Sequence, residues 1–97
     1  MTFVNAPTKG ARLELSLEGQ SKDEFVYEVA LLWPAGEGTG RARVSLPEGK
    51  VDLSVDGAPD WLLRTTTSFL RGLARDAREG QPLPRRVARW RDVPTAG

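Results

Sequence analysis

The chain has 97 residues, with 14 Lys and Arg against 13 Asp and Glu, and it contains neither His nor Cys. Its length fits one domain, and its mixed charge with 39% hydrophobic residues is typical of a globular protein rather than a disordered one. Because imidazole and thiol groups are absent, the chain lacks the base of a catalytic triad, a thiolate nucleophile, the usual zinc ligands and any disulfide. We therefore expect no enzyme, no cofactor and no metal site.

No segment of the sequence is typical of a membrane protein. The longest uninterrupted apolar run, Val29 to Trp33, is far shorter than the ~18 residues that a transmembrane helix needs. Residues 1–20 lack the basic start and the apolar stretch of a signal peptide. The expected compartment is therefore the cytoplasm, and no membrane partner is expected.

Four segments between residues 11 and 56 alternate apolar and polar side chains, which is typical of half-buried strands. Turn residues separate these segments, so the sequence predicts a four-stranded antiparallel meander. The inward-facing positions of the four strands are Leu13, Leu15 and Leu17; Phe25, Tyr27, Val29, Leu31 and Trp33; Ala42, Val44 and Leu46; and Val51, Leu53 and Val55.

The alternation also predicts how the strands pair. In the first hairpin we expect Leu15 opposite Val29, because the register that sets Leu13 there would place Glu14 against Glu28. The other predicted pairs are Trp33–Ala42, Leu31–Val44, Leu46–Val51, Val44–Leu53, Ala42–Val55 and Arg41–Asp56. The glycine-rich stretch 36–40 joins two strands rather than a strand and a helix, so we interpret it as a flexible hairpin tip and not as a phosphate loop.

After residue 56 the apolar period changes from two to 3.6, which predicts a helix over about residues 59–79. Pro59 and Asp60 suit its first turn, and Gly80 followed by Pro82 suits its end. One face of this helix is apolar and wide enough to pack on a sheet. That face carries Leu62, Thr66, Phe69, Leu70, Leu73 and Ala77.

The remaining tail is rich in proline and arginine. Pro82-Leu83-Pro84 predicts an extended connector, and residues 85–91 suit a short helical turn with Val87 and Trp90 on one side. We expect the large Trp90 ring to dock on the domain. The first eight residues and residues 93–97 are expected to be mobile, which leaves an ordered core of about 11–91 within a single domain, 1–97.

Charge is divided unevenly along the chain. Residues 1–60 carry six basic and ten acidic side chains, whereas residues 61–97 carry eight arginines against three acidic side chains. Four of these arginines share one narrow face of the predicted helix, and four follow in the tail. Guanidinium groups bind phosphates and carboxylates, so the cluster suits nucleic acid or an acidic protein. Two plainer interpretations are a solvated helix face and pairing with the acidic strands. The eight residues are Arg64, Arg71, Arg75, Arg78, Arg85, Arg86, Arg89 and Arg91.

Four antiparallel strands followed by a helix, over about residues 11–79, resembles the topology of the single-strand-binding transcriptional coactivator and Whirly-type domains. That resemblance implies binding of nucleic acid on the sheet through basic and aromatic residues. The outward sheet face of this chain argues against the same binding mode, because acidic residues outnumber basic ones there. It carries Glu14, Glu18, Glu28, Asp52 and Asp56 against Arg41, Arg43 and Lys50.

The sequence thus predicts an α+β fold, in which a four-stranded antiparallel meander packs one face on a C-terminal amphipathic helix and a Pro/Arg-rich tail follows. The expected function is a non-enzymatic interaction module with a protein partner, and the alternative is a nucleic-acid-binding protein that uses the arginines. Val26, Ala30 and Leu32 face away from the helix. We expect the tail, in preference to a second subunit, to cover them, which leaves monomer and homodimer both open.

Overall fold

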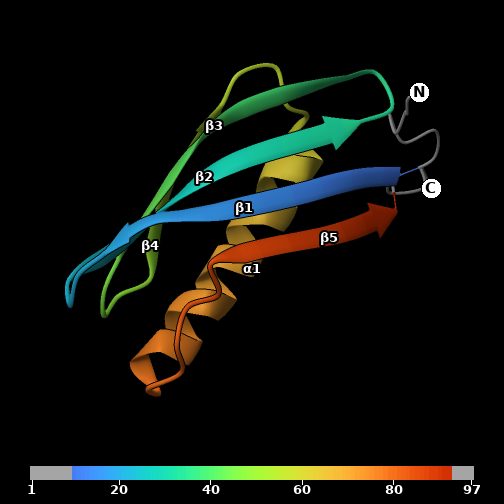
Figure 1. Ribbon diagram of the computed structural model, residues 1–97. Coiled ribbons are helices and arrows are strands. Elements are labelled where there is room, and N and C mark those ends of the chain that lie inside the picture. The colour runs from blue at the N-terminus through green and yellow to red at the C-terminus, as the bar shows by residue number, and fades with distance from the viewer. Residues whose placement is uncertain (1–9, 93–97) are drawn as a thin grey trace.

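The computed structural model describes residues 10–92 and has an α+β architecture of five strands and one helix (Figure 1). All five strands belong to one antiparallel sheet with the order β4-β3-β2-β1-β5, and the helix crosses one face of this sheet obliquely. The termini expected to be mobile lie in residues 1–9 and 93–97, outside the described residues. The elements are β1 (Gly10–Gln20), β2 (Glu24–Trp33), β3 (Gly36–Ser45), β4 (Lys50–Val55), α1 (Asp60–Arg78) and β5 (Arg86–Asp92).

The fifth strand corrects the prediction of a helical turn in the tail. Residues 81–84 have no regular secondary structure and residue 85 lies in a bend, and β5 then pairs antiparallel with residues 10–16 of β1 along its whole length. Val87 lies opposite Leu15 and is 6% exposed. The pairing gives the backbone of β1 a partner on its second side, which a helical turn could not do.

The first predicted register is confirmed, and the other two are wrong. Leu15 pairs with Val29, as the repulsion between two glutamates predicted. In the second hairpin Trp33 pairs with Gly36 across the two-residue turn Pro34-Ala35, so residues 36–40 are strand and not a flexible tip. In the third hairpin the predicted pairs are shifted by two residues, and Val44 lies opposite Val51.

Glycines at alternate positions of β3 explain these shifts. Gly38 and Gly40 lie on the inward side of the strand, opposite Leu31 and Val29. A Cβ at Gly40 would overlap the Ser54 carbonyl oxygen, and one at Gly38 would lie 2.8 Å from a backbone oxygen of residue 56. Because β4 and the segment after it approach β3 so closely, these positions accept no side chain.

The core lies between the sheet and α1. The inward residues of β1, β2 and β3 pack against Leu62, Leu70 and Ala74 of the helix, all of which are fully buried. Burying one such leucine side chain contributes about 1.5–3 kcal/mol. Thr66 is buried as well, and its hydroxyl donates a 2.8 Å hydrogen bond to the Leu62 carbonyl, which satisfies the polar group.

The helix is confirmed within a residue of its predicted bounds. Pro59 stands at its N-cap, and Gly80 follows its end with a positive φ of 88°, the conformation for which glycine is suited. Leu73, expected in the middle of the apolar face, is 9% exposed. No helix among residues 10–92 is long and apolar enough to span a membrane.

The prediction that the tail covers the outward face is wrong. Val26, Ala30 and Leu32 are half-buried on the face of the sheet that turns away from α1. The segment from Val87 to Trp90 does not lie over them, because it extends the sheet at its edge beside β1.

Candidate interaction surfaces

β5 is the last strand of the sheet, and no described residue pairs with its outer edge. The Leu17 N–H donates a 2.8 Å hydrogen bond to the Arg85 carbonyl. In an antiparallel ladder the hydrogen-bonded pairs alternate, so Val87 and Arg89 direct their backbone groups toward β1. The backbone N–H and C=O of Arg86 and Ala88 therefore point away from the sheet, and both residues are exposed.

The Arg89 side chain crosses this edge. Its guanidinium carbon lies 5.7 Å from the ring centroid of Phe69 on α1, and its Nη1 donates a 3.0 Å hydrogen bond to the Ala88 carbonyl. Arg89 thus connects the helix layer to an outward-pointing backbone oxygen of β5. A guanidinium in this position gives the free edge a positive charge.

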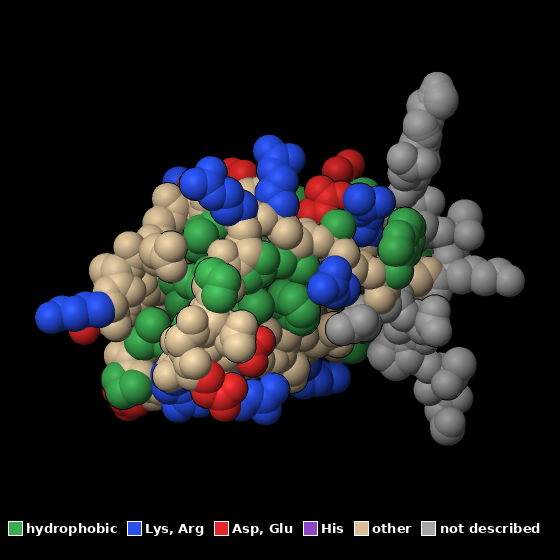
Figure 2. Space-filling model, turned by 60° about the horizontal axis from the view of Figure 1, so that its bottom comes forward, with side chains coloured by type: hydrophobic (Ala, Val, Ile, Leu, Met, Phe, Trp, Pro, Cys, Tyr) green, Lys and Arg blue, Asp and Glu red, His purple; other side chains and the backbone are tan. Residues whose placement is uncertain are grey.

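Apolar side chains gather beside this edge. Figure 2, which brings the lower side of Figure 1 forward, shows hydrophobic side chains in the middle of that side with charged side chains around them. A hollow of about 320 Å³ opens there between the end of α1 and the segment that leads to β5. Its lining residues are Leu73, Asp76, Glu79, Gln81, Pro82, Leu83 and Pro84.

Trp90 does not dock as expected. Its side chain is 55% exposed, the largest exposure of any large hydrophobic residue among residues 10–90. Position 90 pairs with position 12, which puts the indole on the outward face of the sheet, where the Arg12 guanidinium carbon lies 5.7 Å from the ring centroid. The Arg12 Nε in turn lies 2.6 Å from a carboxylate oxygen of Glu14.

The arginines of β1 and β3 are paired with carboxylates, whereas those of the helix are not. Besides Arg12, Arg41 lies 2.9 Å from Glu18 and Arg43 lies 3.8 Å from Glu24. On α1 the four arginines are exposed, and only Arg78 has a described partner, the Pro47 carbonyl at 2.7 Å. Among the side chains of residues 10–90, no carboxylate lies within 4.0 Å of the helix arginines.

The structure divides the eight predicted surface arginines into two groups. Arg64, Arg71, Arg75 and Arg78 follow the exposed face of α1. Arg85 and Arg86 instead line a hollow of about 410 Å³ beside the end of β1, and Arg89 contacts Phe69. The backbone of Arg91 belongs to β5, while its side chain lies outside what the structure describes. The arginines of α1 and those near β5 therefore lie in different layers of the molecule.

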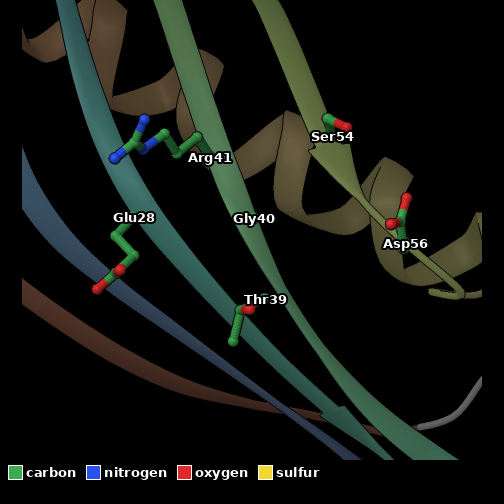
Figure 3. Close-up of a pocket in the computed structure, with 6 residues that line it drawn as sticks. All are labelled: Glu28, Thr39, Gly40, Arg41, Ser54 and Asp56. Atoms are coloured by element: carbon green, nitrogen blue, oxygen red, sulfur yellow. The ribbon is translucent and has the colours of Figure 1, made fainter.

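A third hollow, shallow and of about 420 Å³, lies on the outward face of the sheet (Figure 3). It is lined by Glu28, Thr39, Gly40, Arg41, Ser54 and Asp56. Glu28 and Asp56 stand at opposite sides of it. Within residues 10–92, no three acidic side chains lie together in a way that could hold a metal ion.

Tyr27 is a titratable group with a displaced pKa. Burial raises the pKa of its hydroxyl from 10.0 to about 12. The hydroxyl donates a 2.7 Å hydrogen bond to the Pro84 carbonyl, in the segment that leads to β5. A phenol whose pKa is raised in this way remains protonated at neutral pH, so it anchors the tail and cannot serve as a base.

Sequence reasoning missed the edge of β5, because this strand does not alternate apolar and polar side chains. Val87 shares one face of the strand with Arg89, while Ala88 shares the other with Trp90. No protein-family model, curated protein or solved structure matches this chain.

Proposed function

We propose that this protein is a non-enzymatic interaction module that binds a protein partner on its β5 side. The observation that carries the proposal is the convergence there of outward backbone groups, half-buried apolar side chains and arginines. Protein-binding surfaces are enriched in aromatic residues and arginine, and Trp90 with Arg86 and Arg89 matches that composition.

A photo-reactive side chain placed at Ala88 of the full chain tests this proposal in the native host. Ser68, which is exposed on α1, is the matched control position. The expected result is a defined protein adduct from position 88 and none from position 68. The captured protein should then bind the purified chain, and Trp90→Ser should weaken that binding. Equal adducts from both positions, or binding that Trp90→Ser leaves unchanged, would contradict the proposal.

The alternative function is nucleic-acid binding through α1. It is favoured by the three exposed arginines, Arg64, Arg71 and Arg75, for which the described residues provide no carboxylate. Changing all three to Gln should leave the fold intact, since Gln is a good helix former. It should also weaken binding to every nucleic-acid sequence alike and lower the salt slope by up to about one unit for each phosphate that an arginine no longer neutralises.

Titration with a mixed pool of single- and double-stranded DNA at low salt measures nucleic-acid binding by the wild-type chain and by the triple variant. No binding by the wild-type chain at about 100 μM, where weak electrostatic contacts should survive, rules the alternative out. A triple variant that loses stability but no ligand would indicate that these arginines serve only the fold.

A further inference from the structure

We propose that the free edge of β5 accepts an extended acidic segment of a partner protein as a sixth strand of the sheet. This inference rests on the proposed function and names its partner chemistry. The mode of binding is strand addition, in which backbone hydrogen bonds supply affinity and alternate side chains supply specificity.

The backbone of β5 is available for such pairing. Arg86 and Ala88 present N–H and C=O groups on the side away from β1, and neither residue is covered by any other described element. The Ala88 carbonyl accepts a hydrogen bond from the Arg89 side chain, which a partner strand can share or replace, because a carbonyl oxygen has two lone pairs.

The charge of this edge selects an acidic partner. Arg85, Arg86 and Arg89 are all exposed and stand within one short stretch, and none has a carboxylate within 4.0 Å among the side chains of residues 10–90. A second β5 strand is a less suitable occupant, since two such strands side by side would bring the arginines of both copies close together, and like charges repel. An acidic strand removes that repulsion and pairs with the guanidinium groups.

The side chains beneath the free edge favour a partner strand in which apolar and acidic residues alternate. Side chains of an added strand point by turns to the two faces of the sheet, about 4.8 Å beyond β5. Those on the inward face would lie beside Phe69 and the hollow lined by Leu73 and Leu83, where apolar groups gain contact. Asp76 and Glu79 at the rim of that hollow disfavour carboxylates there. Acidic side chains therefore belong on the outward face, toward Arg86.

The test uses a capped peptide of about ten residues in which Glu alternates with Val, a length that spans one strand. Two peptides serve as controls: one in which Lys replaces Glu, and one of the same composition in shuffled order. Binding to the full chain is followed by calorimetry and by the NMR shifts of the β5 amides. The Glu/Val peptide should bind, and each control should bind at least about tenfold more weakly.

The matched protein variants are Ala88→Pro and Ala88→Thr. Proline removes the N–H that points to the free edge and leaves the hydrogen bonds between β5 and β1 in place. Edge strands tolerate proline at such positions. Threonine keeps the N–H. Ala88→Pro should lower the affinity for the Glu/Val peptide at least about tenfold, and Ala88→Thr should change that affinity by less than about twofold. Equal binding to both variants overturns strand addition.

A measurement on the wild-type chain covers the case in which Ala88→Pro does not fold. Bound peptide should slow hydrogen exchange of the Ala88 amide and leave the amides of Asp52 and Ser54 on β4 unchanged. Slowing at β4, or none at Ala88, contradicts the proposal. Concentration-dependent dimers in sedimentation, with no peptide binding, would assign the edge to a second copy. A defined adduct from position 88 without peptide binding would overturn this inference and leave the proposed function in place.

Discussion

Tyr27 offers a direct measurement of how the tail is held, because it is the only tyrosine in the chain. Its ring is fully buried, and its hydroxyl donates to the Pro84 carbonyl at 2.7 Å. Ionisation would lose this donor and leave a charge in a desolvated place, so burial raises the pKa to about 12. Tyrosinate absorbance of the folded protein should therefore rise with a midpoint near pH 12, and that of the urea-unfolded chain near pH 10.

The same shift fixes the sign of the pH dependence of stability. Between pH 10 and 12 the folded state keeps a proton that the unfolded state releases, so the contribution of Tyr27 is complete below pH 10 and disappears as pH rises through 12. A two-unit shift corresponds to at most about 2.7 kcal/mol.

Tyr27→Phe serves as the matched variant in urea titrations. It should lose about 0.5–1.5 kcal/mol at neutral pH with its hydrogen bond, and its stability should fall less between pH 10 and 12 than that of the wild-type protein. Circular dichroism across this range shows whether the chain stays folded. A folded protein whose tyrosine ionises near pH 10 would refute the account of Tyr27.

Two further predictions concern packing, and both are checked by urea denaturation. Leu73→Ala should lower the free energy of unfolding by roughly 2–5 kcal/mol through reduced transfer energy and a residual cavity, and a change under about 0.5 kcal/mol would mean that α1 does not pack on the sheet as described. Gly40→Ala should cost about 1–3 kcal/mol or more because its Cβ meets the Ser54 carbonyl, whereas Gly19→Ala, whose Cβ meets nothing within 4 Å, should cost much less.

The sequence predicted the elements whose apolar residues recur with a regular period and missed β5, in which they do not. The helix was found because its apolar face recurs over five turns between a proline and a glycine. The first hairpin was found because only one register separates Glu14 from Glu28. The second hairpin is shifted by six residues and the third by two. A shift by an even number keeps every side chain on the same face, so the facing rule cannot choose between such registers.

Glycine hid the true register of β3. An inward position occupied by Gly38 or Gly40 has no side chain to show which way it faces, and composition alone suggested a loop. The close approach of β4 that makes glycine necessary there is a property of the tertiary structure. The candidate surface was similarly incomplete: its arginines were identified by type, but their division into two groups depends on β5, whose inward face holds one buried apolar residue, Val87.

The arginines of β5 bear on two properties of an exposed strand at once. An unpaired edge can associate with any other edge, and Arg86 and Arg89 oppose this for a second β5 by charge repulsion. The same charges attract an acidic strand. They therefore disfavour a second β5 strand and favour an acidic partner. Salt screens both effects, with a Debye length of about 8 Å at physiological ionic strength. If the edge binds an acidic strand, added salt should weaken binding of the Glu/Val peptide and favour self-association of the chain. If the arginines serve only to prevent self-association, added salt should favour self-association and no peptide binding should be seen.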